Sequence, residues 1–133
     1  MVNQIAVFLE NKKGRMCECC TVLKNAGINL QSMTVADTKD FGILRITTND
    51  NAGAIKALKN AGFLVSSNDL IGIEMPDRVG ALADILELLD KEDINIEYLY
   101  SSVTKEGKAQ IIFKTTDVEK AGEILSHIDL KFL

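Results

Sequence analysis

The feature of this sequence that most limits its fold is an internal repeat. Residues 5–33, IAVFLENKKGRMCECCTVLKNAGINLQSM, align without a gap on residues 71–99, IGIEMPDRVGALADILELLDKEDINIEYL. The alignment places Gly14 on Gly80 at a spacing of 66 residues. Self-similarity at a fixed spacing is typical of repeated structural units, so the chain is predicted to contain two copies of one module.

The repeat continues into the second part of each copy. Residues 43–50, ILRITTND, align on residues 110–117, QIIFKTTD, after one additional residue in the preceding turn. Asn29 falls on Asn95 within the matched segments GINL and DINI. The two copies therefore share their turns as well as their apolar pattern.

Each copy has the pattern strand, helix, strand, strand, helix, strand, judged from apolar periodicity and from turn residues. In the first copy we expect strands at 4–10, 28–37, 43–49 and 63–67 and helices at 14–26 and 52–61. In the second copy we expect strands at 70–75, 94–104, 108–115 and 129–133 and helices at 79–92 and 118–128. Turns are expected at 38–42 and 105–107, and the predicted helix caps are Asp50 or Asn51 and Asp117.

This βαββαβ order predicts an α+β fold of two tandem ferredoxin-like modules, each with an antiparallel sheet and both helices on one face. We expect the modules to span residues 1–67 and 68–133, joined by a short linker, SSND, at 66–69. Because modules of this size bury little surface alone, we expect them to pack together and to form a homodimer.

Charge and composition exclude several classes of protein. The net charge is −4, with 8 Lys and Arg against 5 Asp and Glu in residues 1–66, and 7 against 14 in residues 67–133. A net acidic chain without tryptophan is a poor candidate for nucleic-acid binding. No apolar run reaches the length of a membrane span, and the N-terminus lacks the pattern of a signal peptide. We therefore expect a cytoplasmic protein without membrane association.

No set of residues suggests catalysis. The chain has one histidine, His127, no glycine-rich phosphate loop and no nucleophile motif. We predict that it is not an enzyme and has no catalytic residues, no cofactor and no metal.

Three cysteines lie close together in the first predicted helix. The apolar stripe of the matching helix consists of Leu82, Ile85, Leu86 and Leu89, and the corresponding residues are Met16, Cys19, Cys20 and Leu23. Cys19 and Cys20 are therefore predicted to be buried as small apolar residues, with Cys17 partly exposed. The alternative is a metal-binding ferredoxin-like module that uses Cys17 and Cys20, but the sequence lacks further ligands nearby for zinc.

The turns between the first strand and first helix of each copy are better candidates for function. A helix start offers unpaired backbone N–H groups and partial positive charge, which suit a carboxylate. Gly14 and Gly80 allow close approach to the backbone. Asn29 and Asn95 carry both donor and acceptor groups, and we expect them to lie beside the helix start. The alternative is structural, with glycine and asparagine serving only the turns and the cations around Gly14 forming a solvated loop.

The second turn, MPDRVGALADIL, resembles the ACT domain, a small regulatory module that binds amino acids in many biosynthetic enzymes. The family pattern is an acidic residue, Gly, Leu and a later Asn between apolar residues, here Asp77, Gly80, Leu82 and Asn95. The first copy departs from it, with Asn11 in place of the acidic residue and Met16 in place of Leu. The resemblance covers essentially the whole chain, which looks like a small stand-alone tandem-ACT protein.

The resemblance implies a non-catalytic sensor that binds a free amino acid at the strand–helix turns between ACT modules. The implied ligand-binding residues of the first copy are Asn11, Lys12, Gly14, Arg15, Met16, Asn29 and Leu30. Those of the second copy are Asp77, Arg78, Val79, Gly80, Ala81, Leu82, Asn95 and Ile96. The alternative is an interaction subunit that regulates an enzyme of amino-acid metabolism in trans, without a ligand of its own.

Overall fold

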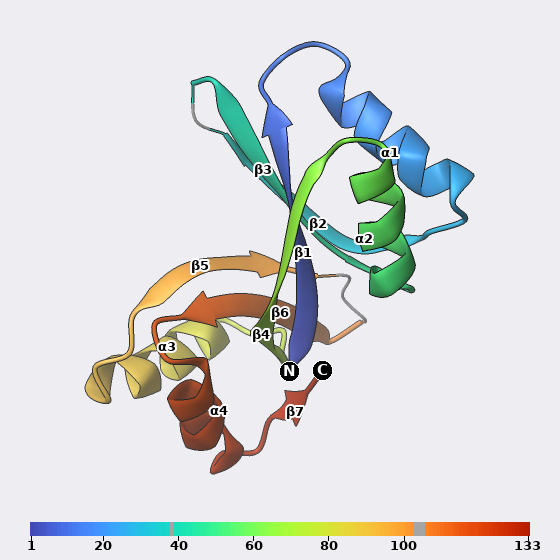
Figure 1. Cartoon of the computed structure of the whole chain (residues 1–133). Helices are drawn as coiled ribbons and strands as arrows, with labels where there is room; N and C mark the ends of the chain where they lie inside the picture. The colour runs from blue at the N-terminus through green and yellow to red at the C-terminus, as the bar shows by residue number, and fades with distance from the viewer. Residues whose placement is uncertain (38, 103–105) are drawn as a thin grey trace. The chain divides into compact units, whose positions relative to one another are not determined.

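In the computed structural model, residues 1–37, 39–102 and 106–133 are described, and within them the chain forms seven strands and four helices (Figure 1). They group into two compact units. The first unit is Asn3–Asn68, and the second is Asp69–Leu133 together with Met1–Val2. The predicted order of strands and helices is confirmed in both.

In the first unit the strands have the order β2-β3-β1-β4, and β3 pairs antiparallel with both β2 and β1. Both helices contribute to one core with β1, β3 and β4 through Cys19, Leu23, Ala54 and Leu58. The elements are β1 (Val2–Glu10), α1 (Arg15–Asn25), β2 (Leu30–Asp37), β3 (Phe41–Thr48), α2 (Asn51–Asn60) and β4 (Leu64–Pro76).

In the second unit β6 pairs antiparallel with β5 and with β4, and β7 pairs with the other edge of β4. Its core again joins both helices to the sheet, through Ile85, Leu89, Ala121 and Leu125. The remaining elements are α3 (Ala81–Lys91), β5 (Ile96–Ser101), β6 (Lys108–Thr115), α4 (Val118–Ser126) and β7 (Lys131–Phe132). The fold is α+β, with two tandem ferredoxin-like modules, as predicted. Thr38 in the first predicted turn, and residues 103–105 around the second, lie outside the described residues.

The predicted linker at 66–69 is wrong. These residues belong to β4, which runs without interruption from Leu64 to Pro76 and so supplies the last strand of the first unit and the first strand of the second. Ser, Asn and Asp disfavour strands only weakly, and pairing with neighbouring strands outweighs that preference. The Nε2 group of Gln4 also donates a hydrogen bond of 3.3 Å to Oδ1 of Asn68.

The buried stripes of α1 and α3 are rotated from the predicted positions. In α3 the buried residues are Ala81, Ile85 and Leu89, while Leu86 is only half-buried. In α1 they are Cys19 and Leu23, whereas Met16 is 36% exposed and Cys20 is half-buried. The prediction is therefore confirmed for Cys19 and wrong for full burial of Cys20. Cys17 is exposed.

The helix caps follow the repeat. The predicted caps Asp50 and Asp117 each accept a hydrogen bond from the backbone N–H three residues later, at 3.0 Å for Gly53 and 2.9 Å for Lys120. Satisfying one of the free N–H groups at a helix start stabilises the helix by about 1 kcal/mol. Asp50, rather than Asn51, is thus the cap of α2.

Candidate functional site

The two strand–helix turns have the same backbone geometry. Gly14 and Gly80 are the N-cap residues of α1 and α3, with φ of 91° and 86° respectively, and no side chain caps either helix. A side chain at Gly80 would meet no atom of the described residues within 4 Å, and one at Gly14 would meet only Oε1 of Glu18, at 4.0 Å. Glycine is therefore required here by the left-handed backbone and not by crowding. The N–H groups of Arg15 and Ala81 already donate to the carbonyls of Lys12 and Arg78, at 3.4 and 3.2 Å. The next two N–H groups of each helix have no acceptor within the helix.

In the first unit the cations of the turn already have partners. Lys12 forms an ion pair with Glu10 at 3.1 Å, and Arg15 forms one with Glu18 at 2.6 Å. Asn11 connects this turn to the β2–β3 hairpin, because its Nδ2 group donates to the carbonyl of Lys39 at 3.2 Å. The Arg15 side chain is only 22% exposed, and its guanidinium carbon lies 4.5 Å from the centre of the Phe63 ring.

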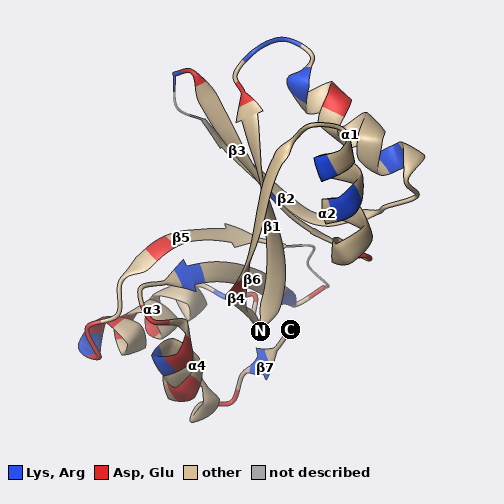
Figure 2. Cartoon of the chain, viewed as in Figure 1, with Lys and Arg blue, Asp and Glu red and all other residues tan. Residues whose placement is uncertain are grey.

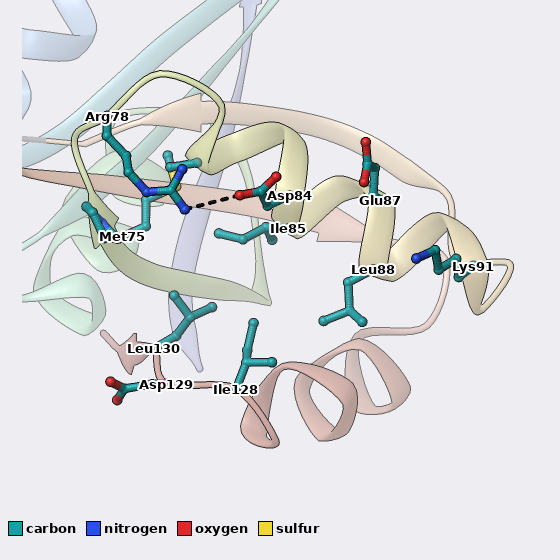
Figure 3. Close-up of a pocket in the computed structure, with 12 residues that line it drawn as sticks. Met75, Arg78, Asp84, Ile85, Glu87, Leu88, Lys91, Ile128, Asp129 and Leu130 are labelled. Carbon is teal, nitrogen blue, oxygen red and sulfur yellow. Dashed lines mark hydrogen bonds and ion pairs between the residues drawn. The ribbon is translucent and has the colours of Figure 1, made fainter.

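In the second unit Arg78 is more open. Its Nη2 group lies 3.1 Å from Oδ2 of Asp84, and the side chains of the pair are 57% and 64% exposed (Figure 3). Asp77 is exposed and its backbone N–H donates to the carbonyl of Gly107 at 3.1 Å. Val79 is fully exposed. Asp77 does not cap this helix, because Gly80 is the N-cap and no side chain caps α3.

The expectation that Asn29 and Asn95 lie beside the helix start is wrong. Each follows the C-terminal end of its helix, and an 11-residue helix such as α1 or α3 is about 16 Å long. The Asn29 N–H donates to Oδ1 of Asn49 at 2.9 Å, and the Asn95 N–H donates to Oγ1 of Thr116 at 3.4 Å. Both asparagines are exposed. Within one unit, a small ligand cannot contact both the helix-start glycine and the asparagine.

Four apolar residues of the predicted site belong to the cores. Leu30 packs on the core of the first unit, Ala81 is a buried member of the core of the second, and Leu82 and Ile96 pack on that core. Their burial is sufficient reason for their apolar character.

A pocket of about 370 Å³ lies along α3 in the second unit. Its apolar surface comes from α3, from the end of β4 and from residues 128–130 (Figure 3). Its charged lining residues are Arg78, Asp84, Glu87, Lys91 and Asp129. Of the predicted site residues it contains Arg78 and Ala81. The complete lining is Met75, Pro76, Arg78, Ala81, Asp84, Ile85, Glu87, Leu88, Lys91, Ile128, Asp129 and Leu130.

Asn95 and Ile96 line a different, more open hollow of about 490 Å³, together with Ala83, Leu86, Glu87, Asp90 and Ile94. The structure thus places Arg78 and Ala81 at one hollow along α3 and Asn95 and Ile96 at another. Sequence reasoning missed residues 128–130 altogether. The available signal was a difference in side-chain size between matched positions of the two copies, because Leu130 falls on Phe63 and Ala81 on Arg15.

The charge difference between the two halves is visible on the helices. Figure 2 shows acidic residues along α3 and α4, while α2 carries the lysines Lys56 and Lys59. Among the described residues, no three His, Cys, Asp or Glu side chains form a group that could hold a metal ion. The helices of this same part of the chain include none that is long and apolar enough to cross a membrane.

Burial also sets the chemistry of the cysteines. Cys19 has no exposed surface, and this burial, with a smaller contribution from neighbouring Cys20, raises the pKa of its thiol from 9.0 to about 11 despite the opposing charge of Arg15. A thiol that stays protonated is a poor nucleophile and a poor metal ligand. Cys19 is therefore a core residue.

Comparison with known proteins agrees with this fold. The family model described as an ACT domain pair matches residues 1–133. The solved structure of protein BT0572 from Bacteroides thetaiotaomicron is 38% identical, with a TM-score of 0.93 over 99% of this chain and 91% of that chain.

More distant structures share the fold. The regulatory subunit of aspartate kinase from Thermus thermophilus is 16% identical, with a TM-score of 0.66 over 94% of this chain and 91% of that one. The corresponding subunit from Thermus flavus is 15% identical, with a TM-score of 0.63 over 94% and 90%. No protein with a curated description matches the chain.

Proposed function

Because this chain belongs to the family of ACT domain pairs, we propose that it is a non-catalytic regulatory protein that binds a free amino acid at its strand–helix turns. Residues 1–67 and 68–133 are its two modules in this proposal. The observation that carries it is the pair of left-handed N-cap glycines, Gly14 and Gly80, at two equivalent helix starts whose first-turn amides no side chain caps. Such amides attract a carboxylate, which every free amino acid has.

The distance between each glycine turn and its asparagine adds a constraint. A single amino acid that contacts both a turn and an asparagine takes them from two different modules, either of one chain or of two chains. Such a ligand favours one packing of modules, or one dimer form, by its difference in affinity for the two states. We propose this as the regulatory mechanism, with a homodimer as the assembled form in the cytoplasm.

Thermal unfolding in the presence of each free amino acid tests the proposal. A ligand that binds only the folded protein raises its melting temperature, by an amount that grows with ligand concentration. We expect at least one amino acid to raise the melting temperature at millimolar concentration. Gly80→Ala strains the left-handed N-cap and should weaken that effect, with Gly107→Ala (φ 73°) as a control for strain elsewhere in the same unit. If no amino acid raises the melting temperature of the wild-type protein, the sensor proposal fails.

A second candidate is an interaction subunit that regulates an enzyme of amino-acid metabolism in trans. It is supported by the shared fold with regulatory subunits of aspartate kinase. Thermal unfolding with free amino acids also distinguishes the two candidates. An interaction subunit without its own ligand shows no change in melting temperature with any amino acid.

A further inference from the structure

We propose that the pocket along α3 holds the side chain of an aliphatic amino acid, so that the second unit determines which amino acid this protein binds. This inference rests on the proposed function and adds the chemical class of the ligand. It follows from a comparison of the two units, from the lining of the pocket and from the charges around it.

The internal repeat provides a control for the pocket. The pocket lies in a groove between α3 and residues 128–130. Ala81 and Leu130 line this groove in the second unit, and their counterparts in the first unit are Arg15 and Phe63. The guanidinium of Arg15 lies over the Phe63 ring, with 4.5 Å between the guanidinium carbon and the ring centre. The Nε atom of Arg15 is buried there without a hydrogen-bond partner among the described residues. Two large side chains thus lie across the groove of the first unit, and two smaller ones leave a volume of about 370 Å³ in the second.

The lining indicates an aliphatic occupant. Figure 3 shows Ile85 and Leu88 from α3 opposite Ile128 and Leu130, which follow α4. Pockets for small molecules commonly have volumes of about 300 to 1,000 Å³, with mostly apolar walls and a few polar groups that orient the ligand. Burial of a leucine-sized side chain contributes about 1.5 to 3 kcal/mol, while a charged side chain loses its hydration.

Charged groups at the edge suit the two charges of a free amino acid. Arg78 presents a guanidinium that binds a carboxylate through two parallel hydrogen bonds. Asp84 provides a carboxylate for the ammonium group. The existing Arg78–Asp84 ion pair is highly exposed, and such pairs contribute only about 0 to 1 kcal/mol. Either partner can therefore turn to the ligand at small cost.

The test transfers the large side chains of the first unit into the second. We expect leucine, isoleucine, valine or methionine at about 10 mM to raise the melting temperature of the wild-type protein by about 2 °C or more. Aspartate, glutamate and lysine should raise it less. The double variant Ala81→Arg, Leu130→Phe should lose this shift, because the same pair of residues already lies across the groove of the first unit.

The matched control opens the other groove. Phe63→Leu, at the counterpart of Leu130, should retain the wild-type shift, and loss of the shift in this variant would place the site in the first unit and overturn the inference. As a measurement that needs no variant, leucine titration should move the methyl NMR signals of Ile85, Leu88 and Leu130. Unmoved methyl signals, alongside a melting temperature that does respond to amino acids, would also overturn it.

Failure of this inference differs from failure of the proposed function. If amino acids stabilise the protein equally with and without Ala81→Arg and Leu130→Phe, the sensor proposal stands and the aliphatic pocket is wrong. If no amino acid stabilises the wild-type protein, both are wrong.

Discussion

Asp93 has a left-handed backbone conformation, with φ of 59°, at the position where Gly27 has φ of 72° in the first unit. Two backbone hydrogen bonds correspond at the two helix ends, and one of them joins the N–H of Ile28 or Ile94 to the carbonyl of Leu23 or Leu89, at 2.9 and 3.1 Å. The N–H of Gly27 donates to the carbonyl of Lys24 and that of Asp93 to the carbonyl of Asp90, both at 3.0 Å. Both α1 and α3 therefore end in a Schellman motif, which favours glycine at this position.

Exchanging these two residues should change stability in opposite directions. Asp93→Gly removes the cost of a left-handed non-glycine residue and a negative charge from a helix C-terminus. We expect it to raise the free energy of unfolding by about 0.5 to 1 kcal/mol, and Gly27→Asp to lower it by a similar amount. Chemical denaturation measures both changes. A destabilising effect of Asp93→Gly would show that the Asp93 side chain has a structural role.

A second matched pair differs in hydrogen bonding. Oγ1 of Thr48 donates to Oδ1 of Asn51 at 2.7 Å, whereas Oγ1 of the equivalent Thr115 is buried without a partner among the described residues. The reason lies in the sequence, because the counterpart of Asn51 is Val118.

Replacing Thr48 or Thr115 by valine, which has nearly the same shape as threonine, should have different effects on stability at the two positions. Thr48→Val should lower the free energy of unfolding by about 1 to 2 kcal/mol, because it also removes the acceptor for the N–H of Asp50. Thr115→Val should be neutral or stabilising by about 0.5 to 1 kcal/mol. An equal decrease in the free energy of unfolding of the two variants, measured by urea denaturation, would contradict this difference in hydrogen bonding.

Titration of Cys19 should make stability depend on pH in the alkaline range. The pKa of this thiol is raised to about 11 in the folded protein from 9.0, so between these values the unfolded chain loses its proton first. Stability is therefore fully present below pH 9 and decreases as pH rises toward 11, by about 1 to 3 kcal/mol. Denaturation at pH 8.5 and 10.5 should show this decrease in the wild-type protein. The Cys19→Ala variant, in which the other titrating groups remain, should show a smaller decrease in stability between the two pH values.

Thiol accessibility gives an independent check on the cysteine cluster. Cys17 is exposed, Cys20 is half-buried and Cys19 has no exposed surface. Alkylation of the folded protein at pH 8, followed by mass spectrometry, should label Cys17 first and leave Cys19 unlabelled until the protein unfolds. Early labelling of Cys19 would mean that the core of the first unit opens readily.

Much of the fold follows from local patterns. The spacing of apolar residues predicted the four helices and every strand but β4, which was predicted as two strands. The caps were predicted as Asp50 or Asn51 and as Asp117, because capping depends on a few neighbouring residues. The prediction of a linker at 66–69 was wrong because strand pairing outweighs local composition. Such pairing involves residues distant in sequence, such as Gln4 and Asn68. The predicted full burial of Cys20 was wrong for a related reason, because the face that a helix buries depends on the sheet against which it packs.

The candidate site was predicted less completely. Gly14 and Gly80 were identified because they recur at the same turn of both copies, and the structure shows that a left-handed N-cap requires glycine there. Asn29 and Asn95 were placed at the wrong end of the helix, although the helix length alone separates them from the glycines. Residues 128–130 were missed because they approach Ala81 only when α4 packs beside α3.

By itself, the sequence determined the repeat, the order of elements and the two glycine turns, because these depend on periodicity and on backbone preferences of individual residues. Only the tertiary structure decided that β4 serves both units, that each asparagine lies a helix length from its glycine, and that the groove of the second unit is open while Arg15 and Phe63 lie across that of the first. These properties depend on contacts between residues far apart in the chain, for which a single sequence carries no local signal.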